Sequence, residues 1–310
     1  MPIVIAPEEV VAPPVETAAW PGFAAMTWTG QDGSEWDMMG SSGIYLGMGV
    51  RGLTMPPVDR FVSTSPALAG SRWRGARTLE RDVFWPLLMW SDEGSEAWVQ
   101  HDRAFWSTMR PDATGVWTVR QPNGLARSLR CRYVDDSDHA TEIDPTGSGW
   151  EVYGIHLVAE QPYWEGDPVT RTWTNDAFVP FFGGSAGAKA PSFFISSGSS
   201  LVSATVSNPG DVDAYPVYTV TGPVDSVSVG YAGNTVSLGA VPAGQQRIID
   251  TRPDRLTVTD ANGVDKWSEL TGDPQFDAPI PPGESVPLSL SMVGSGTVSL
   301  TLTPLYYRAW

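Results

Sequence analysis

Two glycine-containing strings have the spacing of cofactor-binding or catalytic motifs. Residues 47–52 (GMGVRG) match the G-x-G-x-x-G pattern of dinucleotide sites, where a helix must follow at once so that its N-terminus faces the pyrophosphate. Residues 183–187 (GGSAG) match the G-x-S-x-G pattern of hydrolases, where a strand precedes the serine and a helix follows it. Prolines come soon after both strings, at Pro56 and Pro191, and disfavour those helices. We therefore interpret the first string as a bend and the second as part of a linker.

Residues suited to acid–base or zinc chemistry are few and widely spaced. The chain has three histidines, His101, His139 and His156, and one cysteine, Cys131. No two histidines have the H-x-x-x-H spacing of a zinc site, and a single cysteine cannot form a disulfide within the chain. We therefore predict no catalytic residue and no cofactor, and we expect the protein not to be an enzyme.

An acidic loop near the middle of the chain is the best candidate for a metal. Its carboxylates are Asp135, Asp136, Asp138 and Glu142. Carboxylate oxygens suit calcium, but these residues lack the D-x-[DN]-x-[DN]-G spacing of a calcium-binding loop. We favour a solvated hairpin loop and predict no metal site.

Arginines in two segments are the strongest candidates for an interaction site. They are Arg72, Arg74, Arg77, Arg81, Arg127, Arg130 and Arg132. The chain uses 17 Arg against 2 Lys, and the planar guanidinium suits fixed ion pairs between subunits. A GC-rich genome would produce the same excess of Arg over Lys. A solvated sheet face would also carry arginines at alternate positions along a strand. We predict that all of these arginines except Arg127 form a subunit interface.

The composition excludes several classes of function. The formal net charge of −16 argues against direct binding of nucleic acid, although an acidic wall would let DNA pass without sticking. Only 17% of residues are charged, and 12 of the 14 tryptophans lie at or before Trp173, which is typical of large cores and interfaces. No apolar run is long enough for a membrane span, and the N-terminus does not read as a signal peptide. We expect a soluble protein made in a cytoplasm.

The first half of the chain is predicted to be an extended arm followed by a β domain. Residues 1–22 contain five prolines and form the arm, and residues 23–174 form the domain. Its single helix is expected at 94–109, with Ser95 as the N-cap and a buried stripe on one side. That packing stripe consists of Trp98, Phe105 and Met109.

The second half is predicted to be an all-β domain behind a linker. Residues 175–200 are rich in glycine, alanine and proline and form the linker. Short alternating strands then recur between turns over residues 201–310, the pattern of a β-sandwich or jelly roll. We read Trp267 as part of its core.

Phrases in both halves resemble one protein family. In the C-terminal part they are residues 206–218 (VSNPGDVDAYPVY), 267–270 (WSEL), 280–284 (IPPGE) and 302–310 (LTPLYYRAW). In the N-terminal part they are residues 45–52 (YLGMGVRG), 70–81 (GSRWRGARTLER) and 160–164 (EQPYW). Together they resemble the distal tail proteins of siphophages, with a ring-forming domain and a galectin-like C-terminal domain.

The resemblance implies a fold and a role. The fold is mainly β, with an N-terminal antiparallel β-sandwich or split barrel carrying one α-helix and a C-terminal galectin-like β-sandwich. The role is structural: a homohexameric ring in the virion, at the distal end of the tail, through which DNA passes. The implied partners are the tail tube protein, the tail-tip hub, the tape measure protein and receptor-binding proteins. The family specifies no catalytic residues.

Two other functions remain as alternatives. A carbohydrate-binding adhesion protein of the tail tip would need exposed aromatic rings beside polar acceptors, and the C-terminal third offers only Trp267 and Trp310. A hydrolase of the cell wall would need a nucleophile, an acid pair or a metal set, and the sequence contains none that fits its context.

Overall fold

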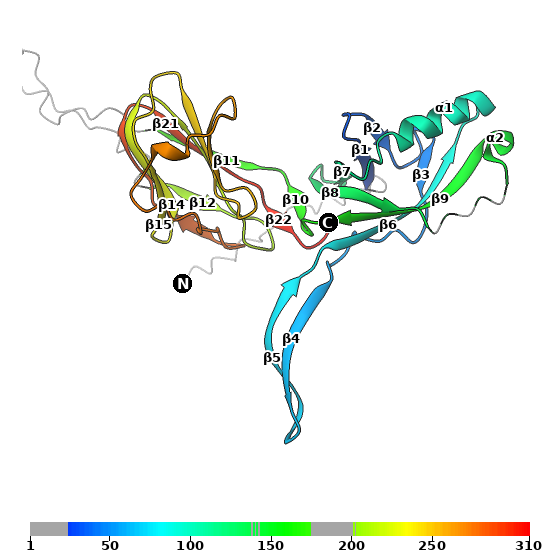
Figure 1. Ribbon diagram of the computed structural model, residues 1–310, viewed down its shortest axis with the longest axis horizontal. Coiled ribbons are helices and arrows are strands. Elements are labelled where there is room, and N and C mark those ends of the chain that lie inside the picture. Colours follow the sequence, from blue (N-terminus) through cyan, green and yellow to red (C-terminus); the bar gives the residue numbers. More distant parts are fainter. Residues whose placement is uncertain (1–23, 138, 140, 142, 175–200, 202) are drawn as a thin grey trace, which may run out of the picture.

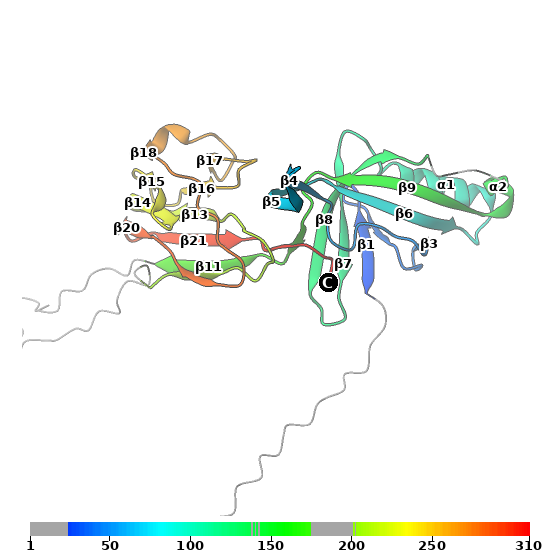
Figure 2. The ribbon, with the colours of Figure 1, turned by 90° about the horizontal axis from the view of Figure 1, so that it is seen from below.

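The computed structural model describes residues 24–137, 139, 141, 143–174, 201 and 203–310. The arm expected at 1–22 and the linker expected at 175–200 therefore lie outside the described residues. The fold is mainly β, as the sequence predicts, and two β-rich bodies lie side by side in Figures 1 and 2.

The N-terminal body is a curled antiparallel sheet with the order β2-β1-β7-β8-β9-β6-β3, and β10 pairs with β8 at one side. Its strands are β1 (Ala25–Thr29), β2 (Glu35–Asp37), β3 (Ile44–Leu46), β6 (Arg81–Trp90), β7 (Thr114–Arg120), β8 (Ala126–Asp135), β9 (Trp150–Ala159) and β10 (Trp164–Gly166). Alternation with a period of two decides which face is buried. In β8, for example, Leu129 and Cys131 are buried while Arg130 is exposed.

Tryptophans form the centre of this core. The side chains of Trp28, Trp85, Trp117 and Trp164 are at most 1% exposed. Their rings contact in series, with centroids 5.2 Å apart for Trp28 and Trp85, 5.3 Å for Trp85 and Trp117, and 5.1 Å for Trp117 and Trp164. The high tryptophan content of the first half thus serves the core directly.

Helix α1 (Ser95–Trp106) covers one face of the sheet (Figure 1) and is shorter than expected. The N-cap is Gly94, at φ 99°, and Ser95 is the first helical residue, so the predicted cap is wrong by one position. A second short helix, α2 (Pro145–Ser148), was not expected. Its signals are the Asp144 side chain, which accepts from the Thr146 N–H, and a proline in the first turn.

A long hairpin of β4 (Val58–Ser65) and β5 (Leu68–Thr78) projects away from both bodies (Figure 1). The two strands pair with each other and with no other named strand of the described chain.

The C-terminal body packs a five-stranded sheet, β11-β21-β13-β16-β17, with a four-stranded sheet, β18-β15-β14-β20, and a β12-β19 pair. The strands are β11 (Val169–Thr174), β12 (Thr205–Ser207), β13 (Val217–Thr221), β14 (Val224–Tyr231), β15 (Asn234–Leu238), β16 (Gln246–Asp250), β17 (Thr257–Asp260), β18 (Leu270–Thr271), β19 (Ser285–Pro287), β20 (Ser291–Gly294) and β21 (Thr297–Leu302). A 3₁₀ helix, η1 (Trp267–Glu269), interrupts them.

Two strands cross the expected domain boundary. β11, placed by the sequence in the first domain, pairs along its whole length with β21 of the C-terminal body. In the other direction, β22 (Leu305–Tyr306), near the end of the chain, pairs with β10 of the N-terminal sheet. The division into 23–174 and 201–310 therefore differs from the observed pairing, because pairing partners distant in sequence cannot be inferred from composition.

Candidate interaction surfaces

Three predicted interface arginines share one face of the β4–β5 hairpin. Arg74 Nε donates to Ser63 Oγ at 3.0 Å, and Arg77 Nη2 lies 3.6 Å from Asp59 Oδ2. Arg72 stands opposite Ser63 in the register and has no carboxylate partner within the described part of the chain. A bulge at Arg74 adds one residue to β5 and so places Arg77 on the same face as Arg72. All three side chains are exposed.

The opposite face of the hairpin exposes several apolar side chains, with Arg60 between them. Trp73 stands opposite Val62, and these side chains are 60% and 43% exposed. Val58, on the same side of β4 as Val62, is 45% exposed. An isolated two-stranded hairpin has little stability of its own, and exposed apolar side chains gathered on one face are typical of an interaction site.

A second exposed apolar region lies on the N-terminal sheet and is called here the outer sheet face. It consists of Tyr45, Leu88, Trp90, Trp150 and Val152. Cross-strand pairs connect these residues over β3, β6 and β9, and Tyr45, Trp150 and Val152 are 43%, 44% and 47% exposed.

Helix α1 lies on the other side of that sheet. Tyr153, which points away from the outer sheet face, donates to Asp102 Oδ1 of the helix at 2.6 Å, and its ring lies 5.2 Å from that of Trp106. The outer sheet face is thus not covered by the helix.

Arg81 does not lie on an interaction surface, contrary to our prediction. It is 1% exposed and donates to backbone carbonyls: Nε to Pro162 at 2.6 Å, Nη1 to Gly52 at 2.8 Å and also to Thr54, and Nη2 to Tyr307 at 2.8 Å. Burial lowers the pKa of this guanidinium to about 10, so it stays charged at neutral pH. Its position in the β6 alternation, on the side of Val83 and not of Asp82, explains the burial.

The arginines of β8 are also engaged within the chain. Arg132 Nε pairs with Glu160 Oε1 at 2.6 Å, and Arg130 Nε lies 3.6 Å from Glu165 Oε1. Arg77 of the hairpin has a carboxylate at the same distance as Arg130, so Arg72 and Arg74 are the strongest candidates for pairing with a neighbour.

The two most distinctive phrases of the C-terminal part meet at the junction between the bodies. Asn208 is fully buried and holds its turn by donating to the Val212 and Ile280 carbonyls at 2.9 Å each. Asp211, in the same turn, bonds through its N–H to the Leu305 carbonyl at 2.8 Å and through Oδ2 to the Tyr307 N–H at 3.0 Å. The terminal segment is therefore clamped between this turn and Arg81.

The predicted helix packing stripe is buried throughout. Trp98 and Phe105 lie on α1 and are 4% and 0% exposed. Met109 lies beyond the helix end, in a turn closed by its N–H on the Trp106 carbonyl at 3.0 Å, and is 5% exposed. Phe105 and Met109 belong to the core of the N-terminal body.

The glycine-rich string 47–52 forms a bend against β6. Its Gly47 N–H donates to the Pro86 carbonyl at 2.7 Å, and the Gly52 carbonyl accepts from Arg81 and from Trp164 Nε1. The backbone groups of these two glycines are thus used by the protein itself. The other string, 183–187, lies outside the described residues.

The three histidines lie in separate environments. His101 packs edge-on against Trp36, His156 lies beside Phe84, and the two ring nitrogens of His139 contact the Val152 carbonyl and Thr141. Among the described residues, no group of three His, Cys, Asp or Glu side chains could hold a metal ion.

Three further observations concern the acidic loop, the cysteine and the helices. Asp138 and Glu142 of the acidic loop lie outside the described residues. Burial raises the pKa of the Cys131 thiol, which disfavours the reactive thiolate. No helix in the described ranges is long and apolar enough to cross a membrane.

Similarity to known proteins is found in the three-dimensional structure and not in the sequence. No family model matches the chain, and no curated protein matches it. Among solved structures, the Dit protein (gp 19.1) of SPP1, described as a paradigm of the hub adsorption apparatus in phages infecting Gram-positive bacteria, matches with a TM-score of 0.60 and 14% identity, over 90% of this chain and 98% of that one. The chain has the fold of a phage Dit protein. A chain of the phage P2 baseplate, in its activated conformation with calcium, matches with a TM-score of 0.54 and 11% identity over the same shares.

Proposed function

We propose that this protein is a distal tail protein of a siphophage and a structural component of the tail tip or baseplate. The observation that carries the proposal is the shared fold with SPP1 Dit, which extends over both bodies and 98% of that chain. The similarity to a chain of the P2 baseplate supports the same role. Two of the segments that resemble this family, the Asn208 turn and the end of the chain, also make buried contacts in the structure.

The protein acts as a homohexameric ring. Two surfaces support self-association: the hairpin, which exposes Trp73 and Val62 on one side and Arg72 and Arg74 on the other, and the outer sheet face. The apolar rows would be buried against an identical neighbour in a closed ring. The hairpin arginines would meet carboxylates of the next subunit, whose net charge is −16.

The ring joins the tail tube to the tail-tip hub, and the tape measure protein and then DNA pass through it. An acidic lumen would repel the phosphate backbone and so let DNA slide. The C-terminal body offers a docking place for receptor-binding proteins. The role is structural and not enzymatic, and the protein resides at the distal end of the tail after synthesis in the host cytoplasm.

The test is the mass of the purified full chain by native mass spectrometry, with charge-reversed variants. The variant R72E/R74E should lose the oligomer, because two hairpin cations that face the next acidic subunit become anions. The matched control R120E/R255E reverses two exposed arginines outside the hairpin and should keep the oligomer. A native chain that stays monomeric, or an oligomer that survives R72E/R74E unchanged, would contradict the assignment of the hairpin.

A further inference from the structure

Trp267 is an exposed aromatic platform, although its sequence context suggested a core residue. It is 44% exposed, and its ring stacks on Phe276 with centroids 5.2 Å apart and planes 8° apart. Phe276 in turn packs against the core of the C-terminal body. Because Phe276 covers one face of the indole, the exposed area is presented by the other face and the ring edge.

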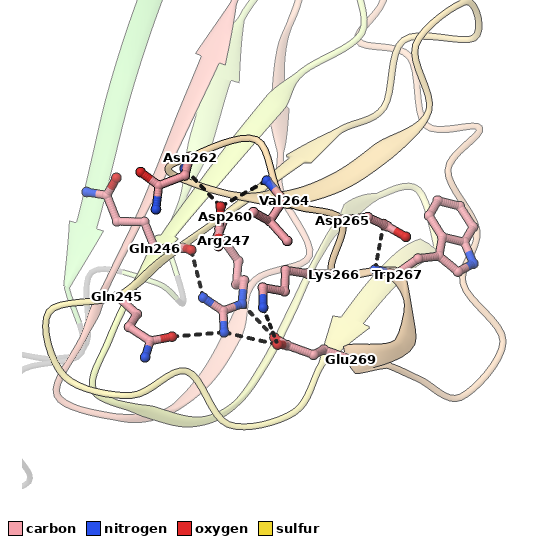
Figure 3. A network of polar contacts seen from close by, with 10 residues as sticks. All are labelled: Gln245, Gln246, Arg247, Asp260, Asn262, Val264, Asp265, Lys266, Trp267 and Glu269. Carbon is pink, nitrogen blue, oxygen red and sulfur yellow. Dashed lines mark hydrogen bonds and ion pairs between the residues drawn. The ribbon is translucent and has the colours of Figure 1, made fainter.

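A buried ion pair holds the segment that carries this ring. Arg247, whose side chain is 5% exposed, donates to Glu269 through Nε at 2.6 Å and through Nη2 at 3.0 Å. Nη2 also donates to Gln245 Oε1 at 3.0 Å, and Lys266 Nζ lies 3.9 Å from Glu269 Oε1. Figure 3 shows this network on one side of η1 and the Trp267 ring on the other. The ring is therefore positioned from two sides, by the network and by Phe276.

A carboxylate stands beside the open ring. Asp265 Oδ1 accepts from the Trp267 N–H at 3.0 Å, and its Oδ2 has no hydrogen-bond partner among the described residues. The carboxylate lies on the same side of the chain as the ring in Figure 3. Asp265 pairs with Thr259 of β17, so the Thr259 and Thr257 hydroxyls lie on the side of the ladder opposite to buried Val258.

We propose that Trp267, Asp265 and the two threonines of β17 form a binding site for a neutral saccharide. One face of a pyranose ring is lined by C–H groups and packs on an aromatic ring, while the hydroxyls at its edge need polar partners. The Asp265 carboxylate, on the same side of the chain as the ring, supplies one such partner, and the threonine hydroxyls lie on the strand that pairs with Asp265. The net charge of −16 disfavours an anionic polysaccharide, and this leaves an uncharged sugar.

The experiment is saturation-transfer difference NMR on the full chain. The probes are galactose, glucose, mannose, rhamnose and the two N-acetylhexosamines, with their short oligomers, at about 5 mM, a concentration that detects the weak affinity expected of a single ring platform. Choline is included because an aromatic face beside a carboxylate also suits a cation. We expect at least one sugar to bind the native chain.

Substitutions then assign the binding to the platform. W267A should weaken binding at least about tenfold, W267F should retain part of it, and D265N should weaken it less than W267A. W310A is the matched control, because Trp310 is 46% exposed, and it should bind like the native chain. Melting curves confirm that each variant folds.

Three binding results would each overturn the proposal. They are the absence of binding by any sugar, equal binding by W267A and the native chain, and binding of choline alone. Native mass spectra of the same samples test whether a second copy of the chain covers the Trp267 ring instead. If W267A loses the oligomer and the native chain binds no sugar, the ring belongs to a subunit contact and the saccharide site is overturned as well. The charge-reversed hairpin variants test the ring separately, so failure of one proposal does not affect the other.

Discussion

Replacing Arg81 with methionine removes a buried cation while keeping most of the side-chain volume. The guanidinium joins three parts of the chain: the bend after residue 52, the segment before β10 and the terminal segment at Tyr307. In the R81M variant the four carbonyls that now accept from Arg81 lose a charged donor. The Gly52 carbonyl keeps another donor, Trp164 Nε1 at 3.2 Å.

The expected loss of stability follows from two opposing effects. A hydrogen bond from a charged group contributes about 1.5–3 kcal/mol, so the four bonds together favour the native side chain. Burying the cation costs several kcal/mol, and methionine avoids that cost. We therefore expect R81M to lower the free energy of unfolding by about 2–4 kcal/mol. For a chain of 310 residues the melting temperature should fall by about 3–6 °C.

The assay is urea unfolding of the full chain, followed by tryptophan fluorescence. R81K is a useful second variant: it keeps the charge but cannot reach carbonyls in three directions, so it should also destabilise the protein. The matched control is R120M, at an exposed arginine outside the hairpin, which should change the free energy of unfolding by less than about 0.5 kcal/mol. Equal stability of R81M and R120M would refute the view that Arg81 clamps the terminal segment.

The remaining predictions concern the Arg247 network, the acid limb of stability and the hairpin. R247M should cost about 2–3 kcal/mol by urea unfolding, because it leaves the partly buried Glu269 with only Lys266, 3.9 Å away, as a cationic partner. R247M/E269M should recover part of that loss, and no loss in R247M would contradict the pairing. The backbone N–H of Val264 donates to the Asp260 carboxylate and lowers its pKa below the usual 3.8. The contribution of this carboxylate to the free energy of unfolding is therefore present above pH 3.8 and is lost as the pH falls through the lower pKa of the folded state. The stability of D260N measured from pH 7 downward should therefore fall less steeply than that of the native chain, and identical curves would be inconsistent with this linkage. W73A should weaken self-association in sedimentation experiments while leaving the unfolding free energy unchanged, and an unaltered oligomer would remove Trp73 from the interface.

Strand positions follow from local pattern and were largely predictable. In 126–134 apolar and charged residues alternate, and residues 83–85 are β-branched or aromatic; both patterns are typical of strands, and β8 and β6 lie there. The last third consists of short strands, as the sequence predicts. Residues 285–292 read as one strand in the sequence but form two, β19 and β20, which pair with β12 and β14 respectively. The chain changes sheets there, and a period of two continues through such a crossing without marking it.

Which arginines are exposed, and on which face, could be found only from the three-dimensional structure. Arg77 shares a face with Arg72 because β5 has a bulge, and bulges depend on how the partner strand pairs. Arg81 is buried although charged, since carbonyls from distant segments converge on it. No sequence pattern brings residues 81 and 307 together.

The exposure of Trp267, in the candidate site, also could not be predicted from the sequence. Its surroundings resemble a family phrase, and large aromatics are commonly core residues. Its exposure arises because η1 leaves the ladder after Lys266 and turns the ring outward onto Phe276. A signal was present in the neighbouring residues Asp265 and Lys266, whose charges favour an exposed segment.

Electron cryo-microscopy of the purified full chain tests the central claim most directly. The account predicts closed rings of six identical subunits, in which the β4–β5 hairpin of each subunit contacts its neighbour and the acidic surface lines a central channel. Particles that remain monomeric at the highest attainable concentration, or assemblies in which the hairpin and the outer sheet face both stay free, would contradict it.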